Sequence, residues 1–146
     1  MNTDQVNQSA SNDDDLENIF GSIIYAYTRA DALEDGILVD ASKIAGQLGY
    51  IYPVAITDAL HTYLSPSQAD KDIGQSYEGR LWDVLWVAMI RIGTHPQKDI
   101  VHFYITQQSI SPYSHKVFND CRLLKAAVGP GDDDHPVITF GFPEDF

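Results

Sequence analysis

The sequence predicts an α+β domain in which helices come first and a small antiparallel sheet of about three strands follows. Up to residue 92 the apolar side chains recur at helical spacing, and after Gly93 they gather in runs rich in Val, Ile, Phe and Tyr. A turn of Gly, Pro and Asp joins the last two runs. The length of 146 residues, 44% of them hydrophobic, suits a single domain, which we place at residues 15–146.

The N-terminal part is expected to hold a tail and two helical segments. Residues 1–14 are polar or acidic and offer almost nothing to bury, which predicts a disordered tail. Apolar residues at helical spacing then predict a helix over residues 16–27. Thr28, followed three residues later by Asp31, has the pattern of an N-cap, so a second segment begins there and ends at Gly36. The sequence leaves open whether these two segments form one kinked helix.

The middle of the chain alternates short apolar segments with polar ones. Residues 37–39 form a short run capable of a strand, and Asp40 is placed to cap a helix over residues 41–48. A proline that suits a helix start then predicts a helix over residues 53–64. Residues 65–77 are expected to be a polar connection.

A central helix and the strands complete the prediction. Residues 80–92 are apolar nearly all round, which predicts a helix surrounded by other elements. Trp82 and Trp86 are therefore expected in the core, with the sheet packed against this helix. Strands are expected over residues 100–106, 117–128 and 137–142, the last two joined by the turn at 129–134.

The net charge of −12 is concentrated at the two ends of the chain. Residues 1–18 and 129–146 each carry five acids and no base, whereas the residues between them are nearly neutral. The nine Lys and Arg residues are scattered singly, and direct binding of nucleic acid needs them clustered. This distribution argues against a nucleic-acid-binding protein and favours a local acidic patch as an interaction surface.

A helix-turn-helix is the nucleic-acid motif whose spacing the chain approaches. Two predicted short helices meet near Gly49, but the second presents Thr57, Asp58 and His61 rather than bases. Two helices that simply pack together are the preferred interpretation.

The chain shows no feature of membrane insertion or export. It contains no apolar run of about 20 residues, and its first residues lack the basic flank and apolar core of a signal peptide. Its single cysteine, Cys121, cannot form an intramolecular disulfide. We therefore expect a cytoplasmic protein.

Catalytic and metal constellations are weak in this sequence. Cys121 with His115 or His102 offers a thiol and a base, but nothing near the cysteine suggests a lowered thiol pKa, so a strand cysteine is the preferred interpretation. The histidines lack the spacing of metal ligands, and no glycine-rich phosphate loop is present. No metal, no cofactor and no catalytic residue is predicted, although catalysis is left open.

Two polar clusters are candidate ligand sites. Arg29, Asp31 and Asp35 lie within two helical turns, which suits either acid–base chemistry or, more simply, a capped and solvated helix end. Arg80 and Asp83 are three residues apart in the apolar helix and could form an ion pair partly in the core.

Three segments carry a resemblance to a known family. They are FGSIIYAYTRADALEDGILVD (20–40), GRLWDVLWVAMI (79–90) and LLKAAVGPGDDDHPVITFGFPEDF (123–146). The chain resembles a family of small acidic bacterial proteins of unassigned function, found on plasmids, phages and chromosomes. The resemblance implies an accessory protein of mobile DNA and gives no catalytic residues.

Together these features predict a non-catalytic protein that binds a basic surface of a host protein. The resemblance suggests a counter-defence inhibitor of the anti-CRISPR or anti-restriction type. Acids and aromatic anchors near the C-terminus form the expected surface: Asp132, Asp133, Asp134, Glu144, Asp145, Phe142 and Phe146. The alternative is a small-molecule or nucleotide ligand, bound or hydrolysed at Arg29, Asp31, Asp35, Arg80 and Asp83. The sequence does not indicate the oligomeric state.

Overall fold

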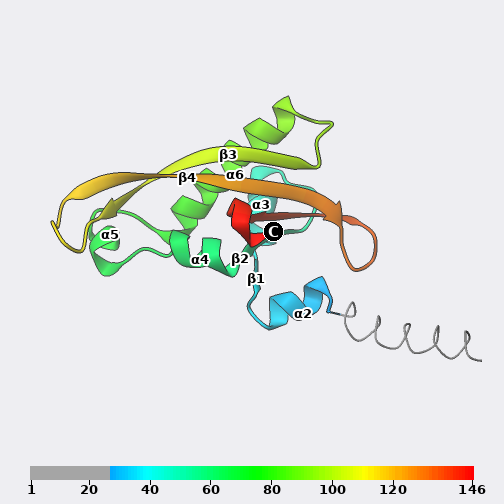
Figure 1. Ribbon diagram of the computed structural model, residues 1–146, viewed down its shortest axis with the longest axis horizontal. Coiled ribbons are helices and arrows are strands. Elements are labelled where there is room, and N and C mark those ends of the chain that lie inside the picture. The colour runs from blue at the N-terminus through cyan, green and yellow to red at the C-terminus, as the bar shows by residue number, and fades with distance from the viewer. Residues whose placement is uncertain (1–26) are drawn as a thin grey trace, which may run out of the picture.

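A computed structural model describes residues 27–146, which form a mixed five-stranded sheet with helices packed on it (Figure 1). The helices are α2 (Arg29–Glu34), α3 (Ser42–Leu48), α4 (Asp58–Leu64), α5 (Gln68–Asp72), α6 (Tyr77–Thr94) and the 3₁₀-helix η1 (Pro143–Asp145). The strands are β1 (Leu38–Asp40), β2 (Val54–Thr57), β3 (Ile100–Ile110), β4 (Val117–Pro130) and β5 (Pro136–Gly141). The mixture of helices and strands agrees with the prediction, but the expected number of strands is wrong.

The sheet has the order β1-β2-β5-β4-β3, and all neighbours are antiparallel except the parallel pair β2 and β5. The last three strands, which were predicted, pair in chain order as an antiparallel meander. Its final turn is confirmed as a hairpin, in which Pro130 pairs with Pro136 and Gly131 N–H donates to His135 C=O at 2.7 Å. This turn projects Asp132, Asp133 and Asp134 from the end of the sheet.

Strand β2 is the element that the sequence analysis assigned wrongly. Val54, Ala55 and Ile56 are all buried, because β1 and β5 flank the strand and other elements cover its faces. A strand buried on both faces is a continuous apolar run and lacks the alternation that marks a half-exposed strand. The helix predicted from Pro53 therefore begins at Asp58, with Thr57 as its N-cap. Because β2 separates α3 from α4, the chain has no helix-turn-helix here.

The ends of the other short helices agree better with the sequence. The predicted capping box of Thr28 and Asp31 is present at the start of α2. Helix α3 ends at Gly49, whose φ of 103° lies in the left-handed region that favours glycine. Helix α5 lies inside the predicted polar connection and begins with a second capping box, formed by Ser67 and Asp70. The predicted tail over residues 1–14 and most of the helix over 16–27 lie outside the described residues.

The hydrophobic core lies between one face of the sheet and helices α3, α4 and α6. Alternate residues of β3, such as Phe103, face this core, whereas Tyr104 on the other face is 67% exposed. Leu124 of β4 and Phe140 of β5 complete the core face, and the Phe103 and Phe140 rings meet edge to face at a centroid distance of 6.2 Å. This layer holds the sheet rigid behind the surface elements described below.

Helix α6 is present where it was predicted, but its two tryptophans are not in the core. Leu81, Val84 and Leu85 face the sheet, whereas Trp82 is 41% and Trp86 51% exposed. An apolar pattern around the whole circumference does not show which side faces the protein. Only one side of α6 packs on the sheet and its neighbouring helices, so the opposite side is left at the surface. No helix among residues 27–146 is long and apolar enough to span a bilayer.

Candidate functional site

The acidic hairpin turn is joined to helix α2 through Asp132. Its two carboxylate oxygens accept hydrogen bonds from the backbone N–H groups of Arg29, at 2.8 Å, and Ala30, at 3.0 Å. These groups belong to the first turn of α2, where N–H groups lack partners within the helix and a negative charge is favoured. Asp132 therefore fixes the start of α2 beside the hairpin turn.

Arg29 holds the same helix against strand β5. Its guanidinium donates to Thr139 Oγ1 at 2.6 Å and to Ile138 C=O at 3.0 Å. Burial lowers the pKa of Arg29, and the nearby carboxylate of Asp132 opposes this change. These contacts account for both terminal nitrogens of the side chain, so Arg29 attaches α2 to the sheet.

The C-terminal acids fold back toward the other end of α2. Asp145 Oδ2 accepts hydrogen bonds from Thr57 Oγ1 at 2.7 Å and from Phe142 N–H at 2.8 Å. A surface depression of about 480 Å³ lies beside this contact, and its lining includes Asp35, Asp58 and Asp145. The end of α2, the start of α4 and the C-terminus therefore contribute carboxylates to one place.

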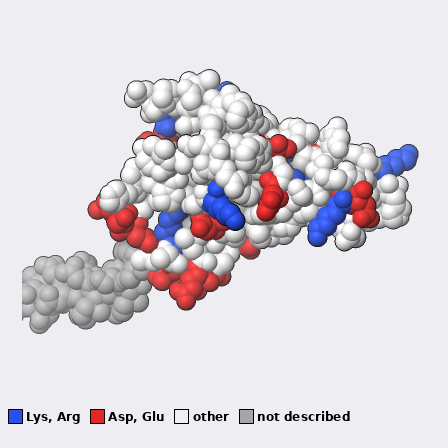
Figure 2. Space-filling view, turned by 180° about the vertical axis from the view of Figure 1, so that it is seen from behind, with Lys and Arg blue, Asp and Glu red and all other residues white. Residues whose placement is uncertain are grey.

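We call the resulting surface the acidic face. It consists of the hairpin acids, the acids of α2 and its C-cap, and those around the depression. Figure 2 shows red side chains gathered at the lower side of the molecule. The members are Asp31, Glu34, Asp35, Asp58, Asp132, Asp133, Asp134, Glu144 and Asp145.

The acids of this face differ in their hydrogen-bond partners. Asp133 pairs with His135 at 3.0 Å, and the hydrogen bond from that side chain lowers the pKa of Asp133. Asp134 has a φ of 65°, in the left-handed region. Within the described residues no side-chain hydrogen bond engages Glu34, Asp134 or Glu144. These three carboxylates are free to meet a partner.

The predicted aromatic anchors are only partly at the surface. Phe146 is about half exposed, and the Lys125 ammonium lies 4.4 Å from the centre of its ring. Phe142 is partly buried and meets the ring of Tyr63 edge to face at 5.5 Å. Phe146 is therefore the aromatic residue of the predicted set that borders the acidic face.

Arg80 forms an ion pair, but its partner is Asp70 rather than Asp83. The Arg80 Nη2 atom lies 3.3 Å from Asp70 Oδ2, and both residues are 4% exposed. Asp83 is exposed on α6. The separation of three residues suggested the wrong acid, because the helix turns Asp83 toward solvent while α5 brings Asp70 to the buried guanidinium.

The buried pair is surrounded by further hydrogen bonds. Arg80 donates to Gln108 C=O at 2.7 Å, and Asp70 accepts from Ile110 N–H at 2.7 Å and from Ser109 Oγ at 3.0 Å. Burial alone would raise the pKa of Asp70, but the hydrogen bonds from Ile110, Ser67 and Ser109 outweigh it and lower the pKa to about 2. Asp70 is therefore ionised at neutral pH.

These contacts also close part of an open sheet edge. Strand β3 lies at one edge of the sheet, and Gln108 C=O and Ile110 N–H are the backbone groups that the ion pair engages. An unpaired edge strand exposes such groups to other chains. Arg80 and Asp70 take the place of a neighbouring strand at this end of β3.

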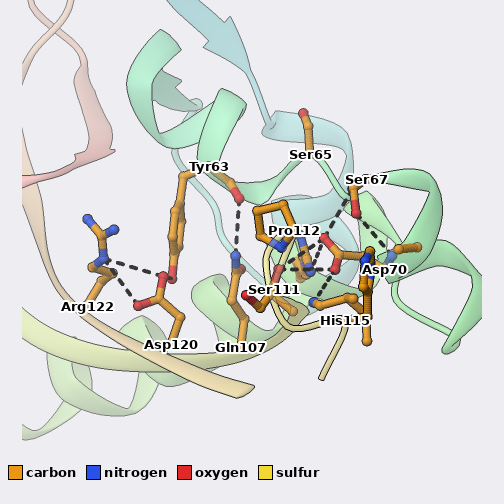
Figure 3. A pocket seen from close by; sticks show the side chains of 14 residues that line it. Tyr63, Ser65, Ser67, Asp70, Gln107, Ser111, Pro112, His115, Asp120 and Arg122 are labelled. Carbon is orange, nitrogen blue, oxygen red and sulfur yellow. Dashed lines mark hydrogen bonds and ion pairs between the residues drawn. The ribbon is translucent and has the colours of Figure 1, made fainter. Parts of the chain in front are cut away.

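A cavity of about 650 Å³ lies beside the ion pair (Figure 3). Tyr63 OH donates to Asp120 Oδ2 at 2.9 Å, and Arg122 lies over the Tyr63 ring, 5.1 Å from its centre. Gln107 Nε2 donates to Tyr63 C=O at 3.1 Å, whereas Gln107 Oε1 is buried and has no hydrogen-bond partner in the described structure. This arrangement offers an unused acceptor and a partly exposed guanidinium.

The comparisons with known proteins place the chain in a family. The sequence profile of a family described as "Family of unknown function (DUF6573)" matches residues 16–146. The chain belongs to this family. The match covers both the acidic face and the cavity of this DUF6573 protein. No curated protein and no solved structure matches the chain.

The five residues of the alternative ligand site do not meet in this DUF6573 protein. Arg29 contacts β5, whereas Arg80 contacts β3, and β4 lies between these strands. Asp31 belongs to the capping box, and Asp35 accepts a hydrogen bond from Tyr27 OH at 2.8 Å. The two arginines therefore serve separate structural contacts.

The structure also separates the Cys121 thiol from His102. Cys121 is exposed on β4 and pairs with Thr106, whereas His102 pairs with Lys125. Four residues along a strand correspond to about 13 Å. His115 lies in the turn between β3 and β4 with a φ of 56°. The register places Cys121 and His102 too far apart for proton transfer.

The sequence analysis missed Asp70, Tyr63, Gln107, Asp120 and Arg122. One signal was available for Asp70. It stands three residues after Ser67 in a capping-box pattern, which predicts a helix inside the assumed connection. The other four residues converge through pairing of β3 with β4 and packing of α4, which local sequence does not reveal.

Proposed function

We propose that this chain is a non-catalytic binding protein whose acidic face docks on a basic surface of another protein. One observation carries the proposal. Asp132 fixes the start of helix α2 to the hairpin turn, and the C-terminal end of α2 lines the same depression as Asp145. The two groups of acids, which the sequence separates by a strand, are thereby linked through the acids of α2.

The electrostatics of this face suit rapid and selective association. Charges of one sign on a rigid surface raise the rate at which an oppositely charged partner is met, and salt weakens this effect. The depression combines the carboxylates of Asp35, Asp58 and Asp145 with the exposed ring of Phe146. An arginine or lysine side chain fits this chemistry, because its stem is apolar and its end is positive.

The partner surface we favour is one that itself binds nucleic acid, such as the channel of a host defence complex. A protein with a net charge of −12 competes there with the phosphates of DNA or RNA. The resemblance to proteins of mobile elements supports a more specific proposal, that the chain is a counter-defence inhibitor.

The test compares two variants that change the net charge equally. The acidic-face variant carries Glu34→Gln, Asp134→Asn and Glu144→Gln, and the control variant carries Glu78→Gln, Asp83→Asn and Asp99→Asn. Each chain is immobilised and used to capture proteins from a bacterial lysate at about 50 mM and about 500 mM salt.

We expect the wild type and the control variant to capture the same basic protein at low salt, and the acidic-face variant to lose it. Added duplex DNA should compete if the captured surface binds nucleic acid. An equal loss of capture by both variants would show that net charge alone is responsible, and full capture by both would show that neither set of acids matters; either result would leave the acidic face without a specific role.

A small polar ligand in the cavity beside Arg80 is a second candidate function. The buried and unpartnered Gln107 Oε1 favours it, because an N–H donor of a ligand such as a nucleotide base would satisfy this atom. Arg122 at the cavity wall would meet an anionic group of the ligand. A nucleotide panel in thermal unfolding tests this. A stabilisation that Arg122→Ala abolishes would support the site, and no shift with any nucleotide would contradict it.

A further inference from the structure

Helix α6 presents a largely apolar stripe to solvent. Trp82, Trp86 and Ile90 are 41%, 51% and 53% exposed and follow one another at intervals of four residues. Gly79 and Gly93 lie on the same side, since about 100° per residue places all five within roughly a quarter of the helix circumference. We call Gly79, Trp82, Trp86, Ile90 and Gly93 the α6 stripe.

The described chain covers only about half of each large side chain of this stripe. The core side of α6 consists of Leu81, Val84, Leu85 and Ala88, which are buried. Single exposed apolar side chains are common, but two adjacent tryptophans and an isoleucine in one ridge are typical of a protein interface.

The stripe is nearly symmetric about Trp86. Large apolar residues, Trp82 and Ile90, stand four residues before and after it, and the two glycines stand seven residues before and after it. A two-fold axis brings identical surfaces together, so it requires a surface that is complementary to itself. An antiparallel pair of such helices places Trp86 against Trp86 of the second copy and Trp82 against Ile90.

We propose that the α6 stripe is the interface of a homodimer in which two α6 helices pack antiparallel around Trp86. The charge distribution supports a second copy over a basic partner. The five residues of the stripe are uncharged, with exposed Asp83 beside them on α6, and the acidic face lies on other elements, around α2 and the hairpin turn. In Figure 1 the C-terminal half of α6 extends above the sheet, whereas α2 lies below it. Two strongly acidic chains can therefore associate through α6 with their acidic faces apart.

Gly93 is a second observation that points to close contact. A Cβ atom at this position would meet nothing within 4 Å, and its φ is not in the left-handed region. The described chain therefore gives no packing reason for glycine, which lowers helix stability relative to alanine. Close approach of a partner helix supplies such a reason. Gly79 differs, because a Cβ there would lie 2.9 Å from Ser76 Oγ, the N-cap of α6.

The size of the stripe sets the expected strength. The fourteen residue steps from Gly79 to Gly93 span about 21 Å of a helix that is about 10 Å wide, so the stripe covers on the order of 200 Å². This area is well below the roughly 800 Å² per partner that typical stable interfaces bury. We therefore expect a concentration-dependent dimer with a Kd on the order of micromolar rather than an obligate one.

Analytical ultracentrifugation of the full chain between about 1 and 500 μM tests the proposal. We expect the average mass of the wild type to rise from monomer toward dimer, and Trp86→Ala to weaken dimerisation at least tenfold. Tyr104→Ala, which removes an exposed aromatic residue of β3, is the matched control and should leave dimerisation unchanged. A wild type that stays monomeric, or a dimer unaffected by Trp86→Ala, would overturn the proposal.

Gly93→Leu keeps the proposal testable if Trp86→Ala fails to fold. Because the Cβ position is open, this variant should unfold at a higher temperature than the wild type when both are dilute and monomeric. It should nevertheless dimerise at least tenfold more weakly, since the added side chain separates the helices. Unchanged dimerisation of Gly93→Leu would exclude the close helix contact. The dimer should also persist at high salt, unlike binding through the acidic face, so the two proposals can fail independently.

Discussion

At the scale of single residues, burial of charge explains the contacts of Arg80. Taking a guanidinium out of water is costly unless an acid and further hydrogen bonds accompany it. Asp70 supplies the charge, and Gln75 Oε1 and the carbonyl groups of Leu64 and Gln108 accept further hydrogen bonds from the guanidinium. The sequence shows an arginine in an apolar helix and so predicts a buried partner. It does not identify Asp70, because that contact depends on where α5 docks.

The pKa of Asp70 gives the pair a defined pH dependence. The pKa is lowered to about 2 in the folded protein from an ordinary value near 4, so ionised Asp70 stabilises the fold above pH 4. This contribution, about 2 kcal/mol, should be lost as the pH falls from about 4 to about 2. Urea unfolding at several pH values measures it.

Asp70→Asn is the matching variant. At neutral pH it should lower the free energy of unfolding by about 3–5 kcal/mol, because Arg80 is left buried without a counter-charge. Between pH 4 and pH 2 the free energy of unfolding of this variant should fall by about 2 kcal/mol less than that of the wild type. If the free energy of unfolding of both proteins depended on pH in the same way, Asp70 would not have the lowered pKa that its hydrogen bonds imply.

At the scale of elements, the sequence predicted those structures that local rules determine. The capping box at Thr28, the end of α3 at Gly49 and the hairpin turn before β5 were all found, because each depends on residues within a few positions. Strand β2 was missed because its strand geometry comes from pairing with β1 and β5 rather than from its own pattern. The orientation of α6 was likewise set by packing.

The tryptophans of α6 should therefore contribute less to the stability of the monomer than a core residue does. In dilute protein, we expect Trp82→Ala and Trp86→Ala each to lower the free energy of unfolding by about 1–2 kcal/mol, because roughly half of each side chain stays exposed. Leu85→Ala, on the buried side, should cost about 2–5 kcal/mol. Because the chain has only these two tryptophans, iodide should quench its native fluorescence readily. Protected fluorescence in dilute protein would place the indoles in the core.

Helix α2 is short, and its position depends on the contact with Asp132. Asp132→Ala should cost about 1 kcal/mol, since two N–H groups of the first turn lose their acceptor. Amide hydrogen exchange of α2 should become faster. Asp134→Asn is the control, because asparagine tolerates the left-handed backbone at that position. Equal exchange in the two variants would mean that Asp132 does not anchor α2.

At the scale of the whole molecule, the sequence revealed the charge at both ends of the final strand but not how the ends are linked. The connection between the two groups of acids depends on Arg29 and Asp132. These residues lie more than 100 positions apart in the chain and were assigned to different candidate sites. The acids of α2 were interpreted as a solvated helix end, and they become part of the acidic face only because α2 docks on β5.

The rate of association with the captured partner tests the acidic face most directly. Stopped-flow or surface-binding kinetics should be measured for the wild type, the acidic-face variant and the control variant at a series of salt concentrations. The two variants carry the same net charge, so a difference between them reports the position of the acids. We predict at least a tenfold slower association and a weaker salt dependence for the acidic-face variant, with the control close to the wild type. Equal rates for the two variants at every salt concentration would contradict the account.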